Sequence, residues 1–432
     1  MQFINFPEMN IVVQGLDAVA IPPMYKMKQI YDSNKIDNPG EYVLKMMDEF
    51  PINRDELVGK RIAVTVGSRG IPFLPDMVKA IIDTLKAWGA KPFIVPSMGS
   101  HGGANAKGQL EVLESLGITP ESMGVEIPSS MEVVEIGKLS NGAPIYVDKI
   151  AMEADGIVLF NKVKPHTEIR GAHESGLLKL IAIGLGNHEG ASMFHAQGPY
   201  KMPGFLPEIG EALIATGKVC FGIGVVQNAY DDICTIKMAD AAHVIELDAE
   251  LLVEAKAKIP DLKFKDIDVL IIDEIGKNIS GSGMDPNVVG RNMSYTFEDN
   301  TGIRYIMVRG LTEESHHSGV GIGLADISTR RCLNDIDWDA TWTNIVTATA
   351  IRQGGNIPLY RNNDYDALIT IIKQCAGSDF ANPRIVRIKN TLETAHIEVS
   401  APLYEELKNH PEIEYVSGPY ELQFDEEGFI KD

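Results

Sequence analysis

The fold class is set by residues 61–103, RIAVTVGSRGIPFLPDMVKAIIDTLKAWGAKPFIVPSMGSHGG. This stretch begins with a β-branched run and a glycine-containing turn. It continues with apolar residues at intervals of three and four, the spacing of an amphipathic helix. A second apolar run, KPFIVP (91–96), then leads into another glycine-rich turn. Strand, turn, helix and strand in this order are typical of a βα unit in a parallel sheet.

The same pattern recurs in EADGIVLFNKVKPH (153–166) and again from VLIIDEIG (269–276) onward. Between them, the polar stretch IPDLKFKDID (259–268) interrupts the pattern and indicates a domain boundary. We therefore predict an α/β fold of two α/β domains with mainly parallel sheets and an active-site cleft between them. The N-terminal domain is expected to span residues 1–265 and the C-terminal domain residues 266–432.

Composition excludes several classes of partner. The 432 residues include 39 Lys and Arg against 60 Asp and Glu, a formal net charge of −21. Binding to nucleic acid or to an anionic membrane by charge needs clustered Lys and Arg, so we expect neither partner. No apolar run reaches the length of a membrane span, and the start, MQFINFPEMN, has no signal-peptide pattern. Four cysteines without CxxC spacing indicate reduced thiols, and we expect a cytoplasmic protein.

Three loops follow predicted strands, where open parallel sheets bind their ligands. They are GSRG (67–70), MGSHGG (98–103) and KVKPHTEIRG (162–171). Backbone N–H groups at a glycine turn that opens a helix suit a phosphate or carboxylate, and Arg69 could add a bidentate donor. A tight turn with a solvent-exposed arginine explains GSRG equally well. The chain has neither the dinucleotide-binding glycine pattern nor a P-loop motif.

Four of the ten histidines, His166, His173, His188 and His195, fall within 30 residues, where chance would place about one. Neutral imidazole binds zinc, copper, iron and nickel, but the spacings of 7, 15 and 7 do not match a zinc finger or HExxH. Lys179 lies in the apolar run LLKLIAI. Apolar surroundings lower the pKa of a lysine and make it a plausible nucleophile, although a lysine reaching from an amphipathic helix to solvent fits the same pattern.

Together, PSMGSHGG, KPHTEIRG, SGLLK and the later His195 resemble the nickel-pincer lactate racemase family and its homologues, which racemise or epimerise 2-hydroxy acids. The resemblance covers residues 55–200 well and the second domain loosely. It implies a nickel-pincer nucleotide, a pyridinium bis-thiocarboxylate mononucleotide that holds nickel. In the family, a thioamide joins this cofactor to a lysine, and a histidine supplies the remaining nickel ligand.

Position by position, Lys179 resembles the covalent lysine and His195 the nickel-binding histidine. His101 and His166 match the two histidines that act as acid and base. Inversion through a planar ketone needs a base for each enantiomer, and the unperturbed pKa of imidazole suits both. The cofactor stores the hydride, so no nicotinamide is needed.

The resemblance also assigns Ser68, Arg69 and Gly102 to cofactor binding, and Arg69 to substrate binding as well. Two further arginines, Arg170 and Arg291, are expected to bind the substrate. Together they suit a larger or more acidic substrate, such as a hydroxy-diacid or a sugar acid.

This chain departs from the family at three places. Val66 stands where the first loop of the family has an acidic residue, and the segment TEIRGAHESGLL (167–178) is longer than its family counterpart. GMDPNVVGR (283–291) only echoes the family segment that binds the substrate carboxylate. These differences concern the choice of substrate more than the reaction.

The sequence thus predicts an isomerase, a racemase or epimerase of a 2-hydroxy acid. Its partners would be the small substrate and the cofactor-maturation enzymes, and assembly as a homo-oligomer is compatible with this prediction. Recombinant protein made without those enzymes would lack the cofactor. A nicotinamide-linked dehydrogenase, a zinc-assisted lyase and a non-catalytic protein that binds an organic anion or the cofactor stay as alternatives. The roles of four histidines are open: His173, His188, His316 and His317.

Overall fold

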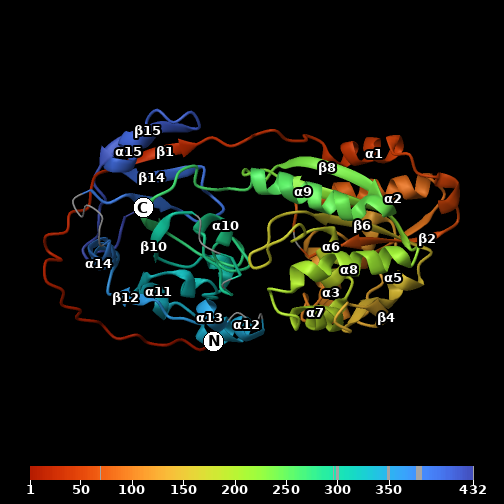
Figure 1. Cartoon of the computed structure of the whole chain (residues 1–432), viewed down its shortest axis with the longest axis horizontal. Helices are drawn as coiled ribbons and strands as arrows, with labels where there is room; N and C mark the ends of the chain where they lie inside the picture. The colour runs from red at the N-terminus through yellow and green to blue at the C-terminus, as the bar shows by residue number, and fades with distance from the viewer. Residues whose placement is uncertain (69, 295, 298–300, 348–350, 376–381, 432) are drawn as a thin grey trace. The chain divides into compact units, whose positions relative to one another are not determined.

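The computed structural model describes residues 1–68, 70–294, 296–297, 301–347, 351–375 and 382–431. The chain divides into two compact units, which we name for their place in the sequence (Figure 1). The central unit is Asp32–Ile259, and the terminal unit combines Met1–Tyr31 with Pro260–Asp432. Within the described ranges, no helix combines the length and apolar character needed to cross a bilayer.

The central unit is built on a five-stranded sheet. Its strand order is β3 (Lys91–Pro96), β2 (Arg61–Val66), β6 (Gly156–Lys162), β7 (Val219–Gln227) and β8 (Ile233–Asp240). The first four strands are parallel, and β8 pairs antiparallel with β7. Short turns between β-branched runs and helical segments produce this order, as the βα pattern of the sequence predicts.

Helices cover both faces of this sheet. Alternate residues of β2 point to opposite faces, so Ile62 and Val64 join one core while Ala63 joins the other. The first core packs under α1 (Pro39–Glu49) and α2 (Leu74–Ala87). The second packs under five elements: α6 (Leu177–Lys179), the π-helical turn Leu180–Gly184, α7 (Asn187–His195), α8 (Met202–Ala215) and α9 (Val244–Lys258). The smaller elements are α3 (Ala106–Ser115), α4 (Pro120–Met123), β4 (Val133–Lys138), β5 (Pro144–Asp148) and α5 (Lys149–Glu153).

The terminal unit is built on an eight-stranded sheet. Its order is β12 (Leu359–Arg361), β11 (Ile327–Thr329), β10 (Ile303–Val308), β9 (Ile267–Ile272), β13 (Ile385–Ile388), β14 (His396–Ser400), β1 (Met24–Gln29) and β15 (Ile413–Tyr420). The first five strands are parallel, and the last three join by antiparallel pairing. The sheet is therefore mixed.

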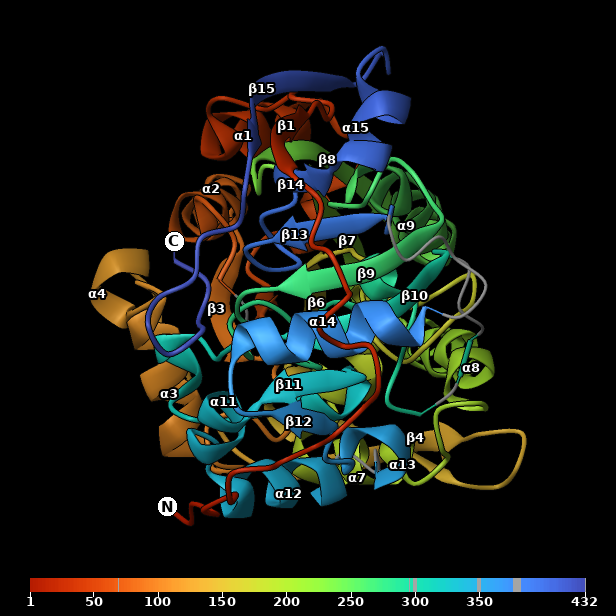
Figure 2. The ribbon, with the colours of Figure 1, turned by 90° about the vertical axis from the view of Figure 1, so that its left-hand side faces the viewer.

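Alternation along β9 again separates two cores. Val269 and Ile271 face α14 (Asp364–Gln374), which Figure 2 shows in front of the sheet, running roughly along the direction of β9 and β11. Leu270 and Ile272 face the opposite core. The remaining helices are α10 (Pro286–Val289), α11 (Arg330–Asn334), α12 (Trp338–Thr347), α13 (Ile351–Gly354) and α15 (Ala401–Leu407).

The α/β fold with mainly parallel sheets is confirmed. The division expected from the sequence, 1–265 and 266–432, differs from the two units at residues 1–31 and 260–265. Residues 1–31 join the terminal unit because β1 lies between β14 and β15. Pairing of β1 with strands near the C-terminus is a long-range contact that no local pattern reveals. The cleft expected between the domains stays a prediction.

Candidate active site

Three loops of the central unit lie at one edge of its sheet. They follow the carboxyl ends of the adjacent strands β3, β2 and β6, which pair with one another in parallel. From β3, at the sheet edge, the chain passes to β6 on the other side of β2, so the strand order reverses there. Such a reversal point is where open α/β sheets bind ligands. We call residues 67–68, 97–103 and 163–166 the histidine edge. Arg69 lies outside the described residues.

The GSHGG loop is held close to neighbouring backbone by its glycines. Gly102 has a φ of +69°, and a Cβ atom there would lie 2.4 Å from the carbonyl carbon of Gly108. The N–H of Gly99 donates to the carbonyl of Gly184 at 3.1 Å, and the buried Gln109 amide donates to the carbonyl of Gly99 at 3.0 Å. Only glycine fits at position 102, so the loop has a fixed path.

His101, the exposed histidine of this loop, forms a hydrogen bond through Nδ1 with the hydroxyl of Ser68. The structure therefore brings together two of the predicted site residues, from loops after β3 and β2. A serine hydroxyl both donates and accepts, so this contact is compatible with either tautomer of the imidazole.

His166 is half-buried, and its ring is tied to its own loop. Its Nδ1 accepts the backbone N–H groups of Glu168 at 2.9 Å and of Ile169 at 3.1 Å. The backbone N–H of His166 donates to Oε2 of Glu174 at 2.8 Å. Hydrogen bonds therefore hold both the backbone and the ring of His166 within this loop.

Glu174 organises residues 167–178, the segment that is longer than its counterpart in the family that the sequence resembles. Its carboxylate is buried, accepts the N–H of Gly171 at 3.3 Å and forms an ion pair with Lys256 at 2.6 Å. Arg170 contributes a further ion pair at 3.4 Å and donates to the carbonyl of His166. The predicted substrate-binding Arg170 therefore engages the loop itself through Nη1, and its role in binding a substrate stays a prediction.

His173 is buried and stabilises the helix start beside Lys179. Its Nδ1 lies 2.9 Å from Oδ2 of Asp248, and Oδ1 of the same carboxylate accepts the N–H of Leu177. A Cβ atom at Gly176 would lie 2.0 Å from that oxygen, so glycine is required for this contact. His173 is a structural partner of α9 in this arrangement.

The charge of Lys179 acts on two of the histidines, His166 and His195. Burial, followed by the charge of Lys179, lowers the pKa of His195. Burial lowers the pKa of His166 well below its usual value, and the charges of Lys179, Lys164 and His195 add to that effect. His195 is the last residue of α7 and its side chain is exposed. Lys179, His166 and His195 are therefore coupled electrostatically, and their roles in a site stay predictions.

The strand end before His166 adds two lysines for which the sequence analysis gave no role. Burial and the neighbouring charge of Lys164 lower the pKa of Lys162 to about 8, although Asp231 opposes this. The alternation of Lys162 and Lys164 in KVKPH could have indicated this pair, because alternate residues of a strand share a face. The histidine edge thus concentrates positive charge in a protein whose formal net charge is −21.

The remaining predicted residues lie elsewhere. His188 is exposed on α7. In the terminal unit, Nη1 of Arg291 donates to Asp326 at 2.7 Å and to the carbonyl of Leu324 at 2.9 Å. His316 and His317 form a turn with positive φ angles of 48° and 67°, and Asp335 lies 2.9 Å from Nδ1 of His317. These contacts stabilise loops of the terminal unit, and a substrate role for Arg291 stays a prediction.

The cofactor that the sequence implies needs protein residues that bind nickel and a lysine that tethers it. Among the described residues, no group of three or more His, Cys, Asp or Glu side chains is placed to hold a metal ion. A cofactor that brings its own sulfur and carbon donors needs only one histidine and one tethering lysine. His195, with a lowered pKa that leaves the ring neutral, and the adjacent Lys179 fit that requirement.

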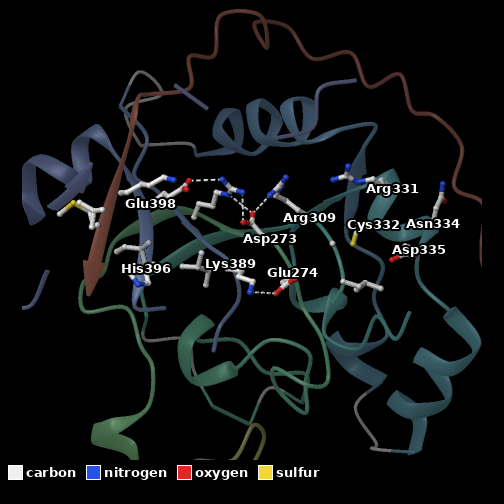
Figure 3. A pocket seen from close by; sticks show the side chains of 18 residues that line it. Asp273, Glu274, Arg309, Arg331, Cys332, Asn334, Asp335, Lys389, His396 and Glu398 are labelled. Carbon is white, nitrogen blue, oxygen red and sulfur yellow. Dashed lines mark hydrogen bonds and ion pairs between the residues drawn. The ribbon is translucent and has the colours of Figure 1, made fainter. Parts of the chain in front are cut away.

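The terminal unit contains a separate cavity of about 1160 Å³, which we call the arginine cavity (Figure 3). Its wall includes the residues that follow β9, β10 and β13, the carboxyl ends of parallel strands. Asp273 accepts from Arg309 at 2.6 Å and from Nε of Arg387 at 2.9 Å. Glu398 lies 3.2 Å from Nη1 of Arg387, and Asp364 accepts from Arg309 at 2.9 Å. Burial lowers the pKa of both arginines, but these carboxylates outweigh it and raise their pKa.

Two solved structures are similar to this chain. The lactate racemase apoprotein from Thermoanaerobacterium thermosaccharolyticum is 13% identical, with a TM-score of 0.52 over 85% of this chain and 99% of that chain. At this identity the similarity concerns the fold alone. A protein from Thermotoga maritima, solved by a structural genomics consortium, is 15% identical, with a TM-score of 0.46 over 64% of this chain and 71% of that chain.

No curated protein matches the sequence. A family model described as a domain of unknown function, DUF362, matches residues 65–289, which is more than half of the chain and includes every described residue of the histidine edge. The chain therefore belongs to the DUF362 family.

Proposed function

We propose that this protein is a racemase or epimerase of a 2-hydroxy acid that works with a nickel-pincer nucleotide tethered to Lys179. The observation that carries the proposal is that Ser68, His101 and His166 follow the carboxyl ends of adjacent parallel strands, with Ser68 bonded to His101, and that the charge of Lys179 acts on His166 and on His195. The lactate racemase-like fold supports it. We further propose that the protein acts in the cytoplasm and receives its cofactor from maturation enzymes.

When bound, the nickel-pincer nucleotide accepts a hydride from the hydroxyl-bearing carbon and returns it. Lys179 would supply the amine that forms the thioamide, and His195 the remaining nickel ligand. A lowered pKa keeps His195 neutral near pH 7, with a lone pair for the metal. His101 would remove the hydroxyl proton, and its bond to Ser68 fixes the direction of the ring.

The substrate carboxylate would be attracted by the cations of the histidine edge. Lys164 belongs to its third loop, Lys162 and Arg170 flank that loop, and the charge of Lys179 acts on His166 within it. The surrounding protein is acidic, so this local positive potential would concentrate the anion only at the site. Burial, followed by the charge of Lys164, lowers the pKa of Lys162, and a bound anion would offset both effects.

Cofactor loading tests the tether. The protein would be coexpressed with the cofactor-making enzymes of a known racemase and examined by intact-mass spectrometry and nickel analysis. We expect a covalent mass increase and bound nickel in the wild type. Lys179→Arg should show no covalent mass increase, because it lacks the amine that forms the tether. Lys162→Arg is the matched control and should load normally. An unmodified, nickel-free wild type beside a fully loaded known racemase would contradict the proposal.

Turnover tests the reaction. Loaded protein would be screened against 2-hydroxy acids in deuterated water, with stereochemical inversion followed by chiral chromatography and deuterium by mass spectrometry. Inversion with retention of the carbon-bound hydrogen is expected, and His101→Ala should reduce the rate about 10²–10⁴-fold. The exposed His188→Ala should leave it unchanged. Binding without inversion would instead indicate an anion-binding protein, and an absorbance change with added NAD would indicate a dehydrogenase.

A further inference from the structure

We infer that His166 is held as the neutral Nε2–H tautomer and serves this site as a hydrogen-bond donor rather than as a second base, with Glu174 as its positioning residue. The identity of the group that receives this hydrogen bond rests on the proposed function. The tautomer itself does not, because it follows from contacts within the chain.

The first step is the environment of Nδ1. Two backbone N–H groups, of Glu168 and Ile169, point at this nitrogen at 2.9 and 3.1 Å. A nitrogen that accepts two donors must present its lone pair, so the single proton of neutral imidazole resides on Nε2. An imidazolium would place a third hydrogen against the two N–H groups. The loop therefore disfavours both the Nδ1–H tautomer and the charged ring.

The second step is what prevents the ring from turning. The ring would have to leave its loop, which Glu174 holds from the other side by accepting the N–H of His166 at 2.8 Å. The carboxylate of Glu174 is buried, and Lys256 on α9 balances its charge at 2.6 Å. A buried, paired carboxylate is costly to disturb, since loss of either partner leaves an uncompensated charge. Glu174 therefore fixes the loop from which the ring projects.

The surrounding charges act in the same direction. Burial disfavours a protonated ring at His166, and the charges of Lys179, Lys164 and Arg170 add to its effect on the pKa. Nε2 has no hydrogen-bond partner from the described side chains or backbone, so this N–H is available to a ligand. Its environment suits an anionic oxygen.

The consequence concerns proton transfer. Under the proposed function, His101 would take the hydroxyl proton as the ketone forms and would return the same proton to the oxygen once the hydride is back on carbon. His166 would donate a hydrogen bond from Nε2 to that oxygen and would neither gain nor lose a proton. A single base would then serve both stereoisomers.

Nitrogen-15 NMR of histidine-labelled apoprotein at pH 7 tests the tautomer, with the His166 signals assigned by their loss in His166→Gln. We expect a protonated Nε2 and an unprotonated Nδ1. A proton on Nδ1, a fast average of both tautomers or a doubly protonated ring would overturn the inference. Because no cofactor or turnover is involved, this outcome is independent of the loading experiment. Failure of loading would refute the proposed function and leave the tautomer standing.

Glu174→Gln tests the positioning role, since it keeps the shape of the side chain and removes its charge. We expect averaged Nδ1 and Nε2 signals for His166 and unchanged signals for the exposed His188. Lys256→Met removes the partner of Glu174 from the other side and serves if the first variant does not fold. A His166 tautomer that is unchanged in the folded variant would overturn the role of Glu174.

Discussion

Two sheet edges in this molecule occupy equivalent places in their folds and differ in electrostatics. The histidine edge and the arginine cavity both lie beyond the carboxyl ends of parallel strands. In the arginine cavity, carboxylates raise the pKa of Arg309 and Arg387. At the histidine edge, burial and neighbouring cations lower the pKa of Lys162 and His166.

The difference separates a structural network from a candidate binding site. Charges that pair within the chain stabilise the fold and leave little electrostatic free energy for a ligand. Basic groups whose pKa is lowered carry an unrelieved cost that an anion would remove, and perturbed basic groups at a strand edge are typical of functional sites. The histidine edge is therefore the candidate site, although the arginine cavity lies in the other unit.

The arginine network gives the largest expected effect. Asp273→Ala removes the carboxylate shared by Arg309 and Arg387 and should lower the unfolding free energy of the terminal unit by up to about 3–5 kcal/mol, because each of these buried arginines loses one of its two carboxylate partners. Peptide-resolved hydrogen exchange in β9 and β13 would measure it. Glu274→Ala is the control, since its pair with Lys389 at 3.9 Å is half-exposed and is expected to contribute under about 1 kcal/mol. Equal losses in both variants would remove the contrast between the two edges.

Backbone packing at the histidine edge gives the next effect. A Cβ atom at Gly184 would lie 2.5 Å from the carbonyl oxygen of Ser97, so Gly184→Ala should destabilise the central unit by about 1–3 kcal/mol. The bond from Gly99 to Gly184 should weaken, with faster amide exchange in the GSHGG loop. Gly204→Ala is the matched control. No atom lies within 4 Å of the added Cβ in α8, so this change should be neutral or stabilising by up to about 1 kcal/mol. Unchanged exchange in Gly184→Ala would show that the edge tolerates repacking.

The sequence predicts those features of both edges that depend on neighbours in the chain. Strand and helix periodicity predicts the α/β class, and the position of GSHGG and KPH after strands predicts a common edge. The roles of Glu174 and His173 depend on Lys256 and Asp248, which lie some 75 or more residues further along the chain on α9. Residue spacing cannot reveal such partners.

The same limit applies to charged residues, because the sequence shows their type but not their charge partners. The sequence predicts that Arg170 and Arg291 bind the substrate. In the structure, Arg170 engages Glu174 and Arg291 engages Asp326. The tautomer of His166 likewise depends on the direction of two backbone N–H groups, which only the folded loop defines. Chemistry-bearing residue types were therefore predictable, and their charge partners were not.

Titration of Lys162 gives the smallest effect and the most direct measure of the contrast. Competitive acylation read by peptide mass spectrometry should give a midpoint near pH 8, below that of the exposed lysines. Lys164→Met should raise this midpoint, because a like charge is removed, and Asp231→Asn should lower it. Since the folded pKa lies below 10.5, the charged form is disfavoured in the folded state. Unfolding free energy should therefore rise between about pH 8 and 10.5 through this group, and Lys162→Met should remove that rise. A midpoint near 10.5 in the wild type would mean that the cations of the histidine edge are as well compensated as those of the arginine cavity, and the electrostatic reason for placing an anion there would be lost.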